Sequence, residues 1–186
     1  MLTLVGVLSS ACVNSSRGIE STREYLDPLT GVTITSLPEP LIMAHAEPRI
    51  SNSLRDYLYV GPVEVNRMGK RSYYLWIDTF STLDRPPIIL NRITLKAGGT
   101  TAELNVPDNA NHAAEIQTPP YTRPLAKTPG YYIPVSAELL TDIARAESIV
   151  IETHSDTLTL DYNLWRSDLA TLRQFANGLA RTRAAN

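Results

Sequence analysis

The sequence YYLWIDTF at residues 73–80 is rich in aromatic and β-branched residues, and both of its alternating faces are largely apolar. A strand of this kind is expected to be covered on both sides. It follows YLYVGPVEV at residues 57–65, and a turn at Gly69-Lys70 joins the two segments. Gly61-Pro62 interrupts the earlier segment, and this pair favours a bulge or an edge kink over an unbroken central strand. The two segments predict the centre of a β-sheet.

Shorter strand signals lie on both sides of this centre. Upstream, Asp27-Pro28 and Gly31 predict a type I turn between short strands, and another strand is expected at residues 41–46. Downstream, apolar and polar residues alternate around turns at residues 97–99 and 154–156. Several short antiparallel strands separated by turns indicate a sandwich or a strongly bent sheet.

Two helices are expected among these strands. Ser136 is a predicted N-cap of a short helix that ends near Ala146, with Glu138 in its first turn. A C-terminal amphipathic helix is predicted from one apolar stripe: Leu169, Leu172, Phe175, Ala176 and Leu179. The predicted fold class is therefore α+β and β-dominated, an antiparallel sandwich or bent sheet with one short helix and the C-terminal helix packed on it.

The composition is that of an ordinary globular protein. Hydrophobic residues make up 43% of the chain and charged residues 19%, with a formal net charge of -2. The basic residues are dispersed, so there is no electrostatic case for nucleic-acid binding. Residues 24–183 are the size of one domain. Within it, the segment 107–130 contains five prolines and no regular period, which predicts a long surface loop.

The N-terminal segment predicts a lipid anchor. Residues 2–8 are mostly apolar and uncharged, and this run is too short to cross a bilayer as a helix. It is followed by Ser9-Ser10-Ala11 and by Cys12, the single cysteine of the chain. This order resembles the lipobox of bacterial lipoproteins, in which the cysteine becomes lipidated and starts the mature chain. Residues 1–11 are therefore expected to be a lipoprotein-type signal peptide.

An alternative is that residues 1–8 form an edge strand and that Cys12 is a buried apolar residue. The polar and aperiodic segment 12–23 favours the first interpretation, because its composition is typical of a flexible tether. No Lys or Arg precedes the apolar run, which leaves open a true start upstream of Met1. With a single cysteine, no intrachain disulfide can form.

Three side chains are the candidates for chemistry. His154 lies in the tripeptide His154-Ser155-Asp156, which has the residue types of a hydrolase triad, but adjacent residues rarely adopt that geometry and a turn is favoured. Asp78 lies within the aromatic strand, where burial would raise its pKa, although capping of a backbone amide is the simpler role. Glu64 is the third candidate and the second carboxylate that an enzyme could use.

Other classes of site lack a motif. His45 and His112 have no ligand partners at metal spacing, and no glycine-rich phosphate loop is present. We therefore expect no metal and no small-molecule cofactor. Tyr121, Tyr131 and Tyr132 lie in or next to the proline-rich segment, and they are the candidate contacts for a binding partner. Packing in the core or at its rim is the favoured role, because tyrosine is common in strands through packing alone.

The chain resembles uncharacterised lipoproteins of Gram-negative bacteria. The resemblance is carried by the leader through Cys12, by YLDPLTG at residues 25–31, and by the block from GPVEVN at 61–66 to YYLW at 73–76. It implies anchoring in the bacterial cell envelope, at the outer membrane or the periplasmic face of the inner membrane, and it carries no catalytic residues. The favoured function is a non-enzymatic binding or accessory module for a protein or envelope partner. The alternative is a small envelope hydrolase or carbohydrate-active enzyme that uses Asp78, Glu64 or His154.

Overall fold

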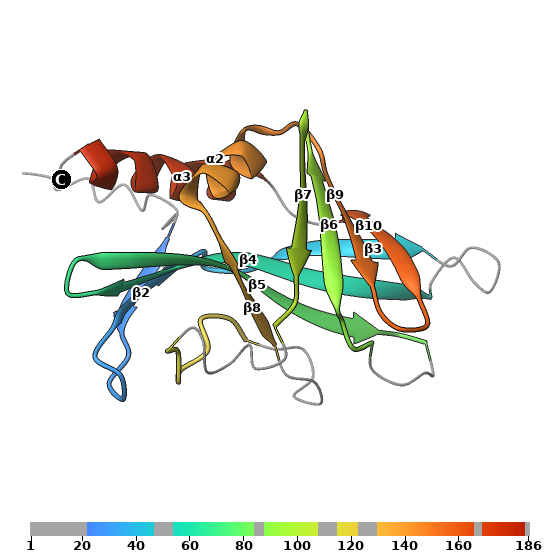
Figure 1. Cartoon of the computed structure of the whole chain (residues 1–186), viewed down its shortest axis with the longest axis horizontal. Helices are drawn as coiled ribbons and strands as arrows, with labels where there is room; N and C mark the ends of the chain where they lie inside the picture. Colours follow the sequence, from blue (N-terminus) through green and yellow to red (C-terminus); the bar gives the residue numbers. More distant parts are fainter. Residues whose placement is uncertain are drawn as a thin grey trace, which may run out of the picture.

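The computed structural model describes residues 22–46, 54–83, 88–107, 115–122, 130–165 and 169–184. In this part of the chain, ten strands form one antiparallel sheet that curls into a half-barrel, with two helices on one side (Figure 1). The strands are β1 (Arg23–Leu26), β2 (Thr33–Ser36), β3 (Leu41–Ala46), β4 (Arg55–Arg67), β5 (Lys70–Ser81), β6 (Arg92–Ala97), β7 (Thr100–Asn105), β8 (Tyr131–Val135), β9 (Ile149–His154) and β10 (Thr159–Leu164); the helices are α2 (Ala137–Arg145) and α3 (Leu169–Ala184). The predicted β-dominated class is confirmed, and a single bent sheet takes the place of a sandwich. The leader, Cys12, His112 and most of the segment 107–130 lie outside the described residues.

The long hairpin of β4 and β5 is the centre of the sheet. Its register runs from Asp56 opposite Ser81 to Arg67 opposite Lys70. The turn residues Met68 and Gly69 both have positive φ, at 50° and 93°, as a two-residue type I′ turn requires. The turn therefore comes one residue earlier than predicted. The expectation that β5 is covered on both faces is confirmed, because the neighbours Trp76 and Ile77 are both buried.

Strand β4 is unbroken at Gly61 and Pro62, so the predicted interruption is wrong. One edge of β4 is shared by two strands: β3 pairs with residues 55–60 and β2 with residues 63–66. The hydroxyl of Tyr121 donates to the carbonyl of Pro62 (2.8 Å) in the gap between them. Because N and O of a strand residue point to the same edge, the proline nitrogen also faces this gap, where no partner strand needs a donor.

The two faces of the sheet are covered by different parts of the chain. Helices α2 and α3 lie above the concave face in Figure 1, and the segment 115–122 passes below the β4–β5 hairpin. The concave face is apolar around Met43, Val60 and Leu75, which lie near Leu140 and Leu172 of the helices. The fold therefore buries both sides of the central hairpin. The two sides are covered by different parts of the chain, namely the segment 115–122 and the helices α2 and α3.

Both helices begin or pack as their sequences predict. The amide of Leu139 donates to the Ser136 hydroxyl (3.1 Å), which confirms the N-cap. All five residues of the predicted α3 stripe are buried. Arg173 of α3 donates from Nε to the carbonyl of Ala144 (3.1 Å) and so ties α3 to α2. No helix among the described residues is both long and apolar enough to cross a membrane.

Candidate functional site

The three candidate catalytic side chains lie in three separate places. The carboxylates of Glu64 and Asp78 are on opposite faces of the hairpin, because Glu64 is opposite Tyr73 in the register and Asp78 is five positions beyond Tyr73. His154 lies on β9, which is four strand spacings from β5, or about 19 Å along the sheet. A hydrolase that combines these residues in one site is therefore not supported by the geometry.

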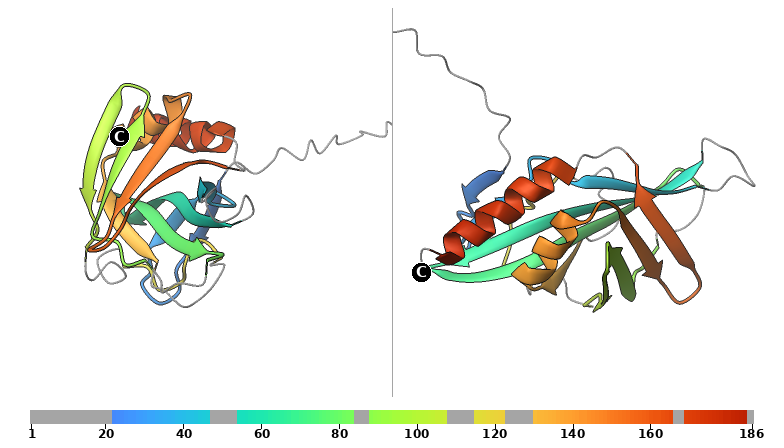
Figure 2. Two further views of the ribbon diagram at one scale, coloured as in Figure 1. Left: turned by 90° about the vertical axis from the view of Figure 1, so that its right-hand side faces the viewer. Right: turned by 90° about the horizontal axis from the view of Figure 1, so that it is seen from above.

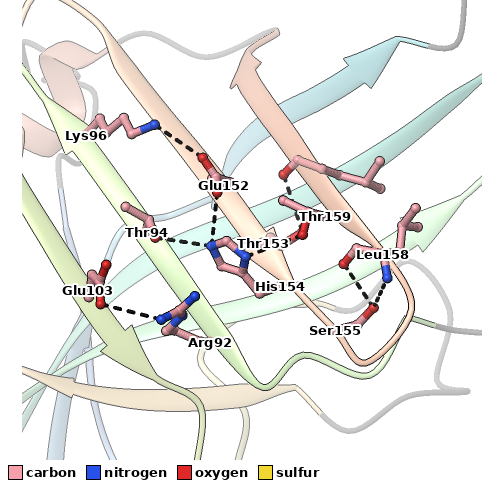
Figure 3. Close-up of polar contacts among 11 residues, drawn as sticks. Arg92, Thr94, Lys96, Glu103, Glu152, Thr153, His154, Ser155, Leu158 and Thr159 are labelled. Carbon is pink, nitrogen blue, oxygen red and sulfur yellow. Dashed lines mark hydrogen bonds and ion pairs between the residues drawn. The ribbon is translucent and has the colours of Figure 1, made fainter.

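His154 belongs to a polar surface on the outer face of β6, β7 and β9 (Figure 3). Its Nε2 lies 3.1 Å from the Glu152 carboxylate and 3.2 Å from the Thr94 hydroxyl. Glu152 also pairs with Lys96 at 3.2 Å. The neighbouring Ser155 closes a turn: its amide and its hydroxyl both donate to the carbonyl of Leu158. This confirms the turn interpretation of His154-Ser155-Asp156.

Asp78 is buried, with 1% of its surface exposed. Its Oδ1 accepts the amide of Thr79 at 3.0 Å, which is the predicted capping role. The strand continues to Ser81, however, so Asp78 does not end it. The carboxylate lies within the covered part of β5 and has no access to a described pocket.

Tyr121, Tyr131 and Tyr132 are buried, with exposed fractions of 3%, 8% and 4%. The ring of Tyr121 packs against Trp76 at a centroid distance of 5.0 Å. A Cβ added to Gly61 would lie 2.3 Å from this ring, so the glycine makes room for it. The three tyrosines are therefore core residues, as packing favours, and their role as contacts for a partner stays a prediction.

A polar pocket of about 400 Å³ lies at the end of the concave face, beneath α3. Figure 2 shows α3 running above the long hairpin toward its turn. The floor is formed by the ends of β1, β2, β4 and β5, and the wall by one side of α3. The lining residues are Thr22, Glu24, Thr33, Thr35, Glu64, Asn66, Arg71, Phe175, Gly178 and Leu179. The apolar interior of the half-barrel thus ends in a polar site.

The ion pair of Glu64 with Arg71 is the centre of this pocket. Arg71 donates from one guanidinium nitrogen to Oε1 of Glu64, and the two side chains are 26% and 5% exposed. Burial raises the pKa of Glu64 above its usual value; Arg71 opposes this change and Glu24 adds to it. Among the described residues, no donor contacts the second oxygen of Glu64. This carboxylate therefore keeps hydrogen-bonding capacity for a ligand.

The pocket was not predicted from the sequence, apart from Glu64 as a candidate. A signal for it exists in the hairpin. With a turn at residues 68–69, Asn66 is opposite Arg71, so that Arg71 and Glu64 become diagonal neighbours on one face. If the turn is placed one residue later, the register shifts and the sequence no longer predicts that Glu64 and Arg71 are neighbours. The contribution of Glu24 and of α3 depends on contacts distant in sequence.

The described residues contain no group of three or more His, Cys, Asp or Glu side chains that could hold a metal ion. The fold and the site define a class in structural terms: a curled antiparallel half-barrel whose concave face is covered by two helices and ends in a polar pocket. Comparison with known proteins finds no matching family model, curated protein or solved structure.

Proposed function

We propose that this protein is a lipoprotein of the bacterial cell envelope, anchored through Cys12 at the outer membrane or at the periplasmic face of the inner membrane. Its β-rich domain is a non-enzymatic binding or accessory module for an envelope component or a protein partner. The observation that supports a binding role is the polar pocket beneath α3, which places a partly buried ion pair in an accessible cavity. The candidate catalytic side chains, by contrast, are dispersed.

The position of the pocket suits a tethered protein. Thr22 lines the pocket, and β1 begins at the next residue. Thr22 is ten positions after Cys12 in the sequence, which allows a distance of at most about 36 Å between them. A lipid on Cys12 would therefore hold the pocket close to the membrane surface. Stable anchoring by acyl chains follows from about 0.8 kcal/mol per buried methylene.

The anchoring is tested by intact-mass analysis of the protein extracted from membranes, for the wild type and for Cys12→Ala. We expect the wild type to lack residues 1–11 and to carry added acyl mass, and Cys12→Ala to carry none and to leave the membrane fraction. An unmodified wild-type chain that begins at Met1 would overturn the lipoprotein assignment. The Cys12→Ala chain should have an unchanged melting temperature, which separates loss of the anchor from loss of the fold.

A further inference from the structure

We infer that the pocket beneath α3 binds a saccharide that carries an amino group, an inference that rests on the proposed binding role of this pocket. The lining is dominated by groups that form directed hydrogen bonds. Three threonine hydroxyls and the amide of Asn66 surround the carboxylates of Glu24 and Glu64 and the guanidinium of Arg71. Such a mixture of donors and acceptors suits a ligand with many hydroxyl groups, each of which can donate and accept.

The pocket also has an apolar wall. Phe175, Gly178 and Leu179 of α3 face the polar floor formed by the strands. A sugar ring has this same division, because its hydroxyl groups lie around the edge while its carbon-bound hydrogens form apolar patches. The volume of about 400 Å³ is in the lower part of the range of ligand pockets, about 300–1,000 Å³, and so suits a small ligand.

The charge of the lining favours a cationic ligand group. Two carboxylates and one guanidinium give the lining residues a formal charge of -1. Arg71 is already paired with Glu64. The exposed Glu24 accepts a long hydrogen bond from the Thr35 hydroxyl, at 3.5 Å, and is available at the rim. An ammonium group on the ligand would form a charge-assisted hydrogen bond with Glu24.

Other ligand classes fit this lining less well. A phosphate would meet two carboxylates, and the single guanidinium is neutralised by Glu64. A divalent cation would meet the guanidinium of Arg71 beside one of its two carboxylate ligands. An acyl chain would leave the polar floor without partners. A simple diamine satisfies Glu24 but not the hydroxyl-rich floor, and the experiment below separates it from an amino sugar.

The inference is tested by titrating the full chain with glucosamine, glucose and putrescine and following backbone amide shifts by NMR. We expect glucosamine to shift the amides of the pocket residues, with a Kd on the order of 1 mM, and to bind more tightly than glucose. Equal binding of glucosamine and glucose would overturn the assignment of a cationic group. Equal binding of putrescine and glucosamine would overturn the saccharide, and so would the absence of pocket shifts with all three probes.

Gly178→Phe provides a variant that fills the pocket without removing a side-chain contact. A Cβ at Gly178 meets no atom within 4 Å, and replacing a helical glycine removes a cost to the helix. We expect this variant to lose glucosamine binding and to keep its melting temperature. Asn177→Phe is the matched control, since Asn177 is exposed on the same helix but does not line the pocket. Equal loss of binding in both variants would place the ligand elsewhere.

Glu24→Gln tests the charged part of the inference. We expect it to weaken glucosamine binding about tenfold while leaving glucose binding unchanged, because one charge-assisted hydrogen bond is lost. Glu103→Gln, on the outer face of the sheet with its side chain 66% exposed, is the matched control and should change neither. Since the chain is titrated without its lipid, failure here leaves the mass analysis of Cys12 unaffected, and failure of anchoring leaves these titrations readable.

Discussion

Asp27 and Glu64 are both buried carboxylates near the same end of the sheet, but their surroundings are opposite. Asp27 accepts three backbone amides: Leu29 (3.0 Å), Gln117 (2.8 Å) and Thr118 (3.0 Å). Burial alone would raise its pKa, yet these amide donors outweigh burial and the pKa lies below its usual value.

Glu64 accepts its hydrogen bond from one side chain, Arg71, and its pKa is raised. The difference separates two uses of a buried charge. A carboxylate surrounded by fixed amides fastens one segment of the chain to another. A carboxylate in a pocket with one oxygen that accepts no hydrogen bond from the protein is partly desolvated in the folded state. A ligand that donates a hydrogen bond to this oxygen can offset the desolvation free energy.

Among the substitutions that test the difference between Asp27 and Glu64, Asp27→Asn is expected to change the free energy of unfolding most. The substitution keeps the shape of the side chain but turns an NH₂ group toward amide donors of the segment 115–118. We expect a loss of about 2–4 kcal/mol in the free energy of unfolding at pH 7, measured by urea denaturation. Because the folded-state pKa of Asp27 is lowered, its contribution is present above the usual aspartate pKa of about 3.9 and is lost as the pH falls below it.

The difference between the wild type and Asp27→Asn should therefore shrink in acid. Asp156→Asn is the control: Asp156 is an exposed aspartate that accepts one side-chain hydrogen bond, from Asn91 at 2.6 Å. It should cost less than about 0.5 kcal/mol. Equal losses for the two variants would show that the buried amide contacts of Asp27 stabilise the fold no more than one exposed side-chain hydrogen bond does.

A smaller loss in the free energy of unfolding is expected from Tyr121→Phe. Tyr121 belongs to the segment 115–122, which Asp27 also contacts. The Tyr121 hydroxyl accepts the amide of Leu37 (3.1 Å) and donates to the carbonyl of Pro62 (2.8 Å), so it bridges the gap between β2 and β3. Removing it leaves two buried backbone groups without this partner, and we expect a loss of about 2 kcal/mol in the free energy of unfolding.

Tyr25→Phe is the matched control for Tyr121→Phe. The Tyr25 hydroxyl donates to the carbonyl of Thr118 at 2.7 Å, but this contact is exposed to solvent. Water can replace it, so the cost should stay below about 1 kcal/mol. A cost for Tyr121→Phe no greater than that of Tyr25→Phe would contradict the bridging role of Tyr121.

Most features that depend on residues close together in the sequence are predicted, apart from the exact position of the β4–β5 turn, whereas most of those that depend on distant contacts are not. The Ser136 cap and the apolar stripe of α3 follow from spacing within one helix, and Gly31, with φ of 70°, follows from turn chemistry. Gly61-Pro62 predicts a bulge or an edge kink in β4, because a proline cannot donate a backbone hydrogen bond to a neighbouring strand. The local sequence does not show that β2 and β3 share this edge of β4 and leave a gap at Pro62. The prolines around Tyr121 predict a surface loop, because the local sequence does not show the hydrogen bond from Tyr121 to Pro62, which is 59 residues away. The pocket combines strand ends with a helix more than 100 residues further along the chain, a juxtaposition that no local pattern contains.

The smallest effect, and the sharpest contrast with Asp27, is expected from Glu64→Gln. The raised pKa means that the folded state holds a proton on Glu64 that the unfolded state has already released, between the usual glutamate value of about 4.3 and the folded value. The stability contributed by Glu64 therefore falls as the pH rises through this window.

The neutral glutamine should match or exceed the wild type in free energy of unfolding at pH 7, within about 1 kcal/mol, and should lose this advantage on acidification. Arg71 keeps access to solvent in the variant, because its side chain is 26% exposed. A loss of about 3 kcal/mol or more at pH 7 would instead identify the ion pair as a structural one, comparable to Asp27, and would leave the pocket without a carboxylate reserved for a ligand.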